Sequence, residues 1–198
     1  KNRWGYIPRN SIHLLHWRST AELAKVVSPS RYTSFLPKMQ GKNVLRIPHP
    51  LYLDYEDFDK KYNVLLKENI SNKYNLPEDY LFCAARVCKF KNVDRAISIA
   101  RSIKKTLVWA GPVEDKKLLR RIQDTGNIYL GDISRTEVIG LMKSSLAVLC
   151  LTKYFPAAEA YGLFQVEAFL AGSKVISSGS GGLIDTIYSP NVILYPNF

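Results

Sequence analysis

The sequence predicts an α/β protein in which a parallel β-sheet is covered by helices on both faces. From Tyr80 onward, short apolar runs typical of buried strands alternate with segments whose apolar residues recur at helical spacing. The connections between these segments are short, and two of the expected strands end at a glycine. Because parallel strands are joined through crossover helices, this alternation favours a doubly covered parallel sheet.

The expected elements of this regular part follow one another in a simple order. Strands are expected at 80–85, 107–110, 128–130, 147–151, 175–176 and 192–194. Between them, the spacing of apolar residues predicts helices around 93–103, 118–122, 138–142 and 162–170. Ser134 and Glu137 have the spacing of a capping box, so the third of these helices should begin just after Ser134.

The residues before Tyr80 are less regular. We expect a helix from a cap at Ser19 or Thr20 through Ala24, strands at 26–30 and 43–47, and a helix around 31–39. Pro48 and Pro50 end the second of these strands. Residues 51–75 are charged and rich in Tyr and Asp, which suits a linker or a surface helix.

The composition limits the class of protein. A net charge of +11 fits nucleic acid, an anionic membrane surface or phosphorylated small molecules, but the basic residues are dispersed and no nucleic-acid motif accompanies them. No apolar run reaches the ~18 to 20 residues of a membrane-spanning helix, and no signal-peptide pattern opens the chain. Cys83, Cys88 and Cys150 form neither a disulfide framework nor a zinc motif, which predicts buried structural cysteines in a reducing, cytoplasmic protein.

Chemically useful residues converge on the carboxyl edge of the predicted sheet, where such sheets bind their ligands. Arg86 and Lys91 follow the first strand, and two cations on one loop suit a diphosphate. Gly111 and Gly131 end the next two strands and would let a backbone or a ligand approach closely. Taken alone, these residues also fit a solvated basic loop and two turn glycines, and both interpretations stay open at this point.

The most informative stretch runs from Glu159 to Glu167. Tyr161, Gly162 and Leu163 are expected to present backbone N–H groups at a helix start, which is a natural anion site. Glu167 lies inside that helix between apolar residues, so we expect it to be partly buried and to need hydroxyl or cationic partners. Glu159 precedes the helix in a loop that can curl over a ligand. As a spacing alone, the two glutamates also fit ordinary surface acids.

A glycine-rich turn follows the strand expected at 175–176. Gly179, Gly181 and Gly182 offer a further run of backbone N–H groups at the head of a short helix that carries Asp185. A simple loop turn is the alternative interpretation.

Taken in order, these motifs resemble the donor-binding half of retaining glycosyltransferases with the GT-B fold. That family, the glycosyl transferases group 1, includes mannosyl- and glucosyltransferases and sucrose synthases. The resemblance runs from Tyr80 to about Ile187 and implies a Rossmann-like sheet. The matched positions, in chain order, are Arg86, Lys91, Gly111, Tyr129, Gly131, Thr152, Glu159, Gly162, Leu163, Glu167, Gly181, Gly182 and Asp185.

The resemblance implies a role for each part of the site. The arginine and lysine would hold the diphosphate, the helix-opening amides the phosphates, the first glutamate the donor sugar, and the second glutamate the ribose hydroxyls. The implied catalytic residues are Arg86, Lys91 and Glu159. The implied donor-binding residues are Glu159, Tyr161, Gly162, Leu163, Glu167, Thr152, Gly111, Tyr129, Gly131, Gly181 and Gly182.

The chain departs from the family pattern at several positions. Ala85 and Asn92 replace the glycines that flank the phosphate loop, and this could narrow or tilt the loop. Ala160 replaces a common proline, Thr152 a serine and Asp185 a glutamate.

The resemblance also suggests how the chain is divided. Residues 1–50 resemble a remnant of the acceptor domain with the crossover, 51–78 a linker, and 79–198 a donor-binding domain that is truncated at its C-terminus. His13 and His16 do not lie in a pattern that would transfer the acceptor-side histidine of the family, so we interpret them as structural or surface residues.

The implied activity is transfer of a sugar from a UDP- or GDP-sugar with retention of configuration. The cations of the phosphate loop would stabilise the leaving diphosphate, so no metal and no cofactor are expected. The acceptor is open among a glycan, a lipid and a protein, and the expected location is the cytoplasm or its membrane surface. No nucleic-acid partner is expected.

Other classes of function stay open. A non-catalytic nucleotide-sugar binding module would explain the small acceptor part, and a basic protein that binds nucleic acid or a membrane surface would explain the charge. The two-glutamate motif argues against a nucleotide-sugar epimerase. A dinucleotide oxidoreductase is disfavoured because no G-x-G-x-x-G motif follows the first strand.

Overall fold

The computed structural model describes residues 26–28, 30, 33, 44–46, 60, 62, 70–153, 158–187 and 192–195. The chain divides into two compact units, Lys1–His49 and Pro50–Phe198. In the first unit, β1 (Val26–Ser28) pairs in parallel with β2 (Val44–Arg46), which confirms the two expected strands. The helix expected through residues 19–24 lies outside the described residues, and of the one around 31–39 only Thr33 is described.

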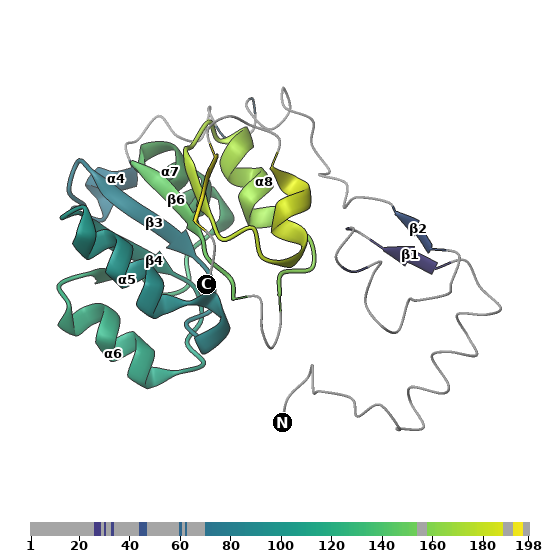
Figure 1. Ribbon diagram of the computed structural model, residues 1–198. Helices are drawn as coiled ribbons and strands as arrows, with labels where there is room; N and C mark the ends of the chain where they lie inside the picture. The colour runs from purple at the N-terminus through teal and green to yellow at the C-terminus, as the bar shows by residue number, and fades with distance from the viewer. Residues whose placement is uncertain are drawn as a thin grey trace. The chain divides into compact units, whose positions relative to one another are not determined.

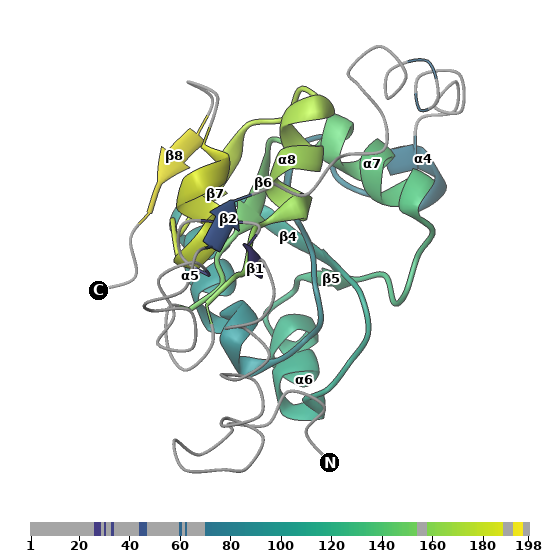
Figure 2. The ribbon, with the colours of Figure 1, turned by 90° about the vertical axis from the view of Figure 1, so that its right-hand side faces the viewer.

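The second unit contains a parallel six-stranded sheet in the order β5-β4-β3-β6-β7-β8 (Figure 1). Its strands are β3 (Tyr80–Ala84), β4 (Thr106–Ala110), β5 (Ile128–Tyr129), β6 (Ala147–Cys150), β7 (Val175–Ser177) and β8 (Val192–Leu194). Figure 2 shows β5 and β8 at opposite ends of the sheet. The predicted parallel α/β architecture is therefore confirmed, with strand ends that differ from the predicted ones by one residue in several places.

Helices cover both faces of the sheet. Among the residues described from Ile70 onward, the α-helices are α4 (Ile70–Lys73), α5 (Val93–Ser102), α6 (Lys116–Asp124), α7 (Arg135–Ser144) and α8 (Leu163–Leu170), and the 3-10 helices are η1 (Lys89–Lys91) and η2 (Gly181–Thr186). The short helix expected after Gly182 is thus a 3-10 helix, and η1 was not foreseen.

The central strands β3, β4 and β6 bury both of their faces, which explains their nearly continuous apolar sequences. Alternate residues point to opposite sides, so Leu81 and Trp109 pack with α5 and α6, whereas Phe82 and Val108 pack with α7 and α8. All four side chains are completely buried. This double core holds the carboxyl ends of the strands in a rigid row.

The start of α7 is tied to α4 by a single carboxylate. Ser134 and Glu137 form the expected capping box, and Glu137 also accepts hydrogen bonds from Lys73 Nζ and Tyr74 Oη, both at 2.7 Å. The hydrogen bond from Lys73, followed by those from Tyr74 and Ser134, lowers the pKa of Glu137 to about 2. Helix α4 is therefore fastened to the domain rather than loose on its surface.

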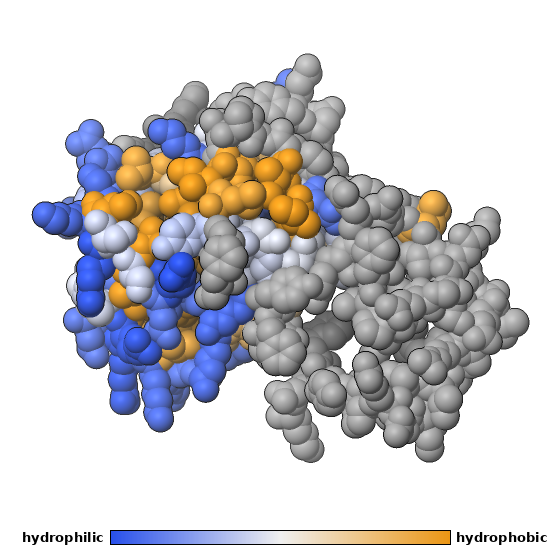
Figure 3. All heavy atoms as spheres, in the orientation of Figure 1, coloured by the Kyte–Doolittle hydropathy of each residue, from blue (hydrophilic) through white to orange (hydrophobic). Residues whose placement is uncertain are grey.

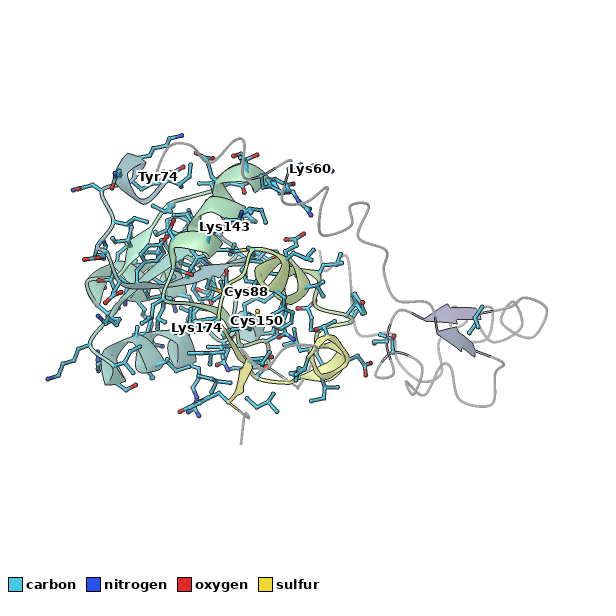
Figure 4. The ribbon with its side chains drawn as sticks, turned by 90° about the horizontal axis from the view of Figure 1, so that it is seen from above. Lys60, Tyr74, Cys88, Lys143, Cys150 and Lys174 are labelled. Carbon is cyan, nitrogen blue, oxygen red and sulfur yellow. The ribbon has the colours of Figure 1, made fainter. Side chains whose placement is uncertain are left out.

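The three cysteines are free and buried, as predicted. In Figure 4, Cys88 and Cys150 lie inside the body of the larger unit. Burial raises the pKa of the Cys83 thiol to about 12, so this thiol stays protonated and behaves as a core residue. Within the described part of the chain, no helix combines the length and the apolar character that crossing a bilayer requires.

Candidate functional site: the carboxyl edge of the sheet

The loop after β3 carries the two predicted cations and has an unusual backbone. It passes through η1 and reaches Asn92, which has φ 61° and ψ 44° and joins η1 to α5. Asparagine is among the few residues other than glycine that adopt this left-handed conformation readily. The replacement of a family glycine by Asn92 therefore preserves the turn. Ala85 is the other position at which the family pattern has a glycine. Gly111, with φ 122°, packs closely against it, because a Cβ at Gly111 would lie 2.6 Å from the Ala85 carbonyl oxygen.

Three of the predicted residues meet in one polar cluster. Lys91 Nζ lies 2.6 Å from a carboxylate oxygen of Glu159 and 3.4 Å from Thr152 Oγ1. The Thr152 hydroxyl also donates to the same Glu159 oxygen, at 3.2 Å. The three side chains come from η1, the end of β6 and the loop before α8. Lys91 and Glu159 lie 68 positions apart in the sequence, so the cluster is a product of the fold.

Arg86 also lies close to the ring of Phe90. Its guanidinium is 5.1 Å from the centroid of the Phe90 ring, and Lys91 Nζ is 5.9 Å from the same centroid. Arg86 pairs with Glu114, and both of these side chains are exposed. The Lys153 amide donates to the Phe90 carbonyl at 2.8 Å, which ties η1 to the end of β6. The Phe90 ring therefore lies close to both cations, a contact for which we found no signal in the sequence.

Helix α8 begins as the sequence predicts. Gly162 is buried and has φ 93°, a conformation that glycine adopts without strain. The backbone N–H groups of Leu163 and Phe164 have no hydrogen-bond acceptor among the described residues. Together with the partial positive charge of the helix start, these groups can bind an anion. Tyr161 is buried directly before this start, and Leu163 is partly exposed.

Glu167 lies on α8 with its carboxylate buried, as predicted. Its partner is Arg135, the first residue of α7, whose guanidinium lies 2.5 Å from the carboxylate. Burial raises the pKa of Glu167, and the charge of Arg135 acts in the opposite direction. The Arg135 side chain itself is 60% exposed. The pairing of Arg135 with Glu167 was not predicted, because nothing in a single sequence indicates that α7 begins beside α8.

Gly181 and Gly182 hold the loop that carries Glu159. The Gly182 amide donates to the Glu159 carbonyl at 2.6 Å. A Cβ at Gly181 would lie 2.4 Å from that carbonyl oxygen, and a Cβ at Gly182 would lie 2.2 Å from the carbonyl oxygen of Ala160. The close approach of two backbones therefore requires both glycines, and the Gly182 amide is engaged within the protein.

Buried polar side chains lock the neighbouring segments. Gln165 donates to the Leu183 carbonyl at 3.0 Å and to Thr186 Oγ1 at 2.9 Å, which joins α8 to η2. Ser178 Oγ donates to the Thr152 carbonyl at 2.8 Å, which joins the ends of β7 and β6. These residues were not predicted, and they act by positioning the cluster.

The remaining predicted residues form a second group at the ends of β4 and β5. Tyr129 Oη donates to the Gly111 carbonyl, and the Gly111 amide donates to the Gly131 carbonyl, both at 2.7 Å. Among the described residues, no hydrogen bond joins this second group directly to Lys91 or Glu159. Among the same described residues, no group of three or more His, Cys, Asp and Glu side chains could hold a metal ion.

Comparison with known proteins identifies the family. The family model described as glycosyl transferases group 1 matches residues 67–192. The chain belongs to this family. A search among curated proteins found no significant match.

Solved structures share the fold. A glycosyltransferase from Rickettsia africae is 17% identical with a TM-score of 0.71, over 98% of this chain and 55% of that one. HepE from Anabaena, solved in complex with UDP-glucose, is 18% identical with a TM-score of 0.64, and the match covers 96% of this chain and 56% of HepE. AviGT4, a glycosyltransferase involved in avilamycin A biosynthesis, is 20% identical with a TM-score of 0.65, over 87% and 50%. The chain thus spans about half the length of these proteins, and its fold is that of one half of a GT-B glycosyltransferase.

Proposed function

We propose that this chain binds a nucleotide-diphosphate sugar at the carboxyl edge of its sheet and serves as the donor-binding half of a hexosyltransferase. The observation that carries the proposal is the contact of Lys91 with Thr152 and Glu159. It joins the basic loop after β3 to the acidic loop before α8. Family membership and the UDP-glucose complex of HepE support the same class of ligand.

The diphosphate would bind where the cations now contact carboxylates. Lys91 pairs with Glu159, and Arg86 pairs with Glu114. A diphosphate offers more acceptor oxygens and more charge than either carboxylate, so it can replace both pairs. The free amides at the start of α8 would hold phosphate oxygens. Release of Glu159 from Lys91 would leave its carboxylate able to accept hydrogen bonds from the donor sugar.

The nucleoside would lie towards α7. The Glu167 carboxylate is the acceptor for the ribose hydroxyls in this proposal, and Arg135 keeps that buried carboxylate ionised and oriented. Tyr129, Gly111 and Gly131, at the ends of β4 and β5, would face the base. The base is uracil or guanine.

Transfer would proceed with retention of configuration. As the glycosidic bond breaks, negative charge grows on the diphosphate, and Arg86 and Lys91 would stabilise it. In this proposal the two cations make a metal ion and a cofactor unnecessary. The reaction would take place in the cytoplasm or at its membrane surface.

A non-catalytic binding module is the second candidate. Transfer of a sugar to an acceptor by this chain alone would exclude the non-catalytic binding module. Donor binding without transfer would exclude sugar transfer by this chain alone and leave the donor site in place.

Isothermal titration tests the donor site directly. We expect UDP or GDP to bind with a dissociation constant in the micromolar to millimolar range, and Lys91→Met to weaken binding about 10- to 100-fold. Lys174→Met is the matched control, because Lys174 is an exposed cation at the amino end of β7, opposite the cluster. The absence of binding by both nucleotides would contradict the proposed site.

Two carboxylate variants test the division of roles. Glu167→Gln should weaken the nucleotide and the sugar nucleotide alike, since both carry the ribose. Glu159→Gln should weaken the sugar nucleotide more than the bare nucleotide. Equal losses in the Glu159 variant would show that this carboxylate does not recognise the sugar.

A further inference from the structure

Glu114 places a negative charge directly beside one of the two cations of the proposed donor site. It lies in the loop between β4 and α6, and its carboxylate accepts a hydrogen bond from Arg86 Nη1 at 2.5 Å. Both side chains reach solvent, with 43% of the Arg86 side chain and 47% of the Glu114 side chain exposed. Glu114 was not among the residues predicted from the sequence, because its partner follows a different strand.

Backbone hydrogen bonds keep this carboxylate within reach of Arg86. The Val87 amide donates to the Pro112 carbonyl at 2.9 Å, and the Glu114 amide donates to the Val87 carbonyl at 3.2 Å. Val87 and Val113 also form an isolated parallel β-bridge. Because Val87 is the direct neighbour of Arg86 in the chain, these bonds hold the backbone of Glu114 beside Arg86 whether or not the ion pair is formed.

The fold does not depend on the ion pair. The backbone bonds of Val87 already join the two loops, and the Asp115 side chain caps α6 by accepting from the amides of Lys117 and Leu118. In Figure 3, hydrophilic side chains gather over α6, the helix that follows this loop. Ion pairs between exposed side chains add little to stability, because water and salt screen them. The Glu114 carboxylate is therefore free to exchange its place at Arg86 with another anion.

We propose that Glu114 competes with the diphosphate for Arg86 and thereby speeds the release of the nucleoside diphosphate that remains after sugar transfer. This role rests on the proposed function, in which a diphosphate replaces both carboxylates at the two cations. In that function Glu159 leaves Lys91 and gains the donor sugar as a partner. Glu114 gains no partner, so its ion pair is lost when the diphosphate binds and is restored when the diphosphate leaves.

The competition weighs more on the product than on the donor. A diphosphate bound at Arg86 lies close to the displaced Glu114 carboxylate, and like charges at short range repel each other. The intact sugar nucleotide offsets this repulsion through its sugar contacts with Glu159. Once the sugar has been transferred, those contacts are gone, whereas the repulsion from Glu114 remains.

Glu114→Gln tests the proposal, because glutamine keeps the size of the side chain and removes its charge. We expect the nucleotide that binds the unmodified chain, UDP or GDP, to bind about two- to fivefold more tightly in calorimetry, the range that an exposed ion pair can supply. Phosphorus NMR line shapes of the same nucleotide should show that most of the gain is slower dissociation. The free energy of unfolding should not change, since the backbone bonds between the loops remain.

Two controls attribute the gain to Arg86. In the Arg86→Met background, Glu114→Gln should change the affinity clearly less than it does in the unmodified chain, because the cation for which both anions compete is absent. Glu78→Gln removes the same charge from an exposed position just before β3, at the opposite edge of the sheet. This variant should bind the nucleotide as the unmodified chain does.

The outcomes separate this inference from the proposed function. Unchanged or weaker nucleotide binding by Glu114→Gln would overturn the competition while leaving the donor site in place. An equal gain in the Arg86→Met background would overturn it as well. If neither UDP nor GDP bound the unmodified chain, the proposed function would fail, and the role of Glu114 would fail with it.

Discussion

At the scale of single residues, the site is a set of cations and carboxylates that already neutralise one another. The position of Lys91 directly after the first strand was enough to predict a cation at the carboxyl edge. Its contacts with Thr152 and Glu159 could not be predicted from spacing, because they depend on how β3 and β6 lie side by side. The sequence thus identified the members of the cluster, and the resemblance to a family suggested their grouping.

Arg135 and Glu167 show what a single sequence leaves out. Glu167 was predicted to be partly buried because apolar residues flank it, and this is confirmed. Its cationic partner sits at the start of another helix, 32 positions earlier in the chain by number. Long-range pairs of this kind have no local signal.

Arg135→Gln tests whether this pair controls the charge of the ribose acceptor. Burial raises the pKa of Glu167 and Arg135 opposes that rise, so removing Arg135 should raise the pKa further. Nucleotide binding needs the ionised carboxylate and therefore weakens as pH falls through this pKa. In Arg135→Gln the weakening should begin at a higher pH than in the unmodified chain.

Titration calorimetry in a series that descends from about pH 8 to about pH 4 measures this shift, because the series begins well above the usual pKa range of a carboxyl group. Arg135→Lys keeps the positive charge and serves as the control, with a pH profile close to that of the unmodified chain. Superimposable profiles for the Gln variant and the unmodified chain would show that Arg135 does not act on Glu167.

At the scale of elements, the strands and helices follow from local patterns, whereas the turns that shape the site do not. The buried strands and the capping box at Ser134 were predicted because apolar runs and capping pairs are local signals. The 3-10 helix η1 was missed, since Lys89 and Lys91 resemble any solvated loop. From the sequence, Gly181 and Gly182 were expected to offer free backbone amides to a ligand. In the structure, both glycines pack against the loop that carries Glu159.

Gly182→Ala should disturb this packing and the donor site together. The new Cβ would lie 2.2 Å from the Ala160 carbonyl oxygen, so the loop that carries Glu159 must move. We expect the free energy of unfolding to fall by about 1–3 kcal/mol and the affinity for a sugar nucleotide to fall with it. Chemical denaturation and titration calorimetry measure the two effects.

Gly172→Ala is the matched control for this substitution. Gly172 follows Ala171, the C-cap of α8, with φ 77°, and a Cβ there would meet nothing within 4 Å. This variant should therefore lose about 1–2 kcal/mol through backbone strain while keeping its donor affinity. If Gly182→Ala bound sugar nucleotides as well as Gly172→Ala does, the Gly182 packing would be irrelevant to the site.

At the scale of the whole molecule, the sheet order explains why residues far apart in the chain meet. The parallel order β4-β3-β6-β7 places the carboxyl ends of these strands in one row, and the loops that follow them carry Arg86, Lys91 and Thr152. The glycine-rich turn follows β7 in the same row. The alternation of strands and helices was enough to predict a parallel sheet. The order of the strands across the sheet could be seen only in the structure.

The most direct measurement is a crystal structure of this chain with the nucleoside diphosphate that binds it. We expect phosphate oxygens within hydrogen-bond distance of Lys91 Nζ and of the first amides of α8, with the ribose hydroxyls at Glu167 and the Lys91–Glu159 pair broken. A diphosphate bound elsewhere, with Lys91 still paired to Glu159, would contradict it.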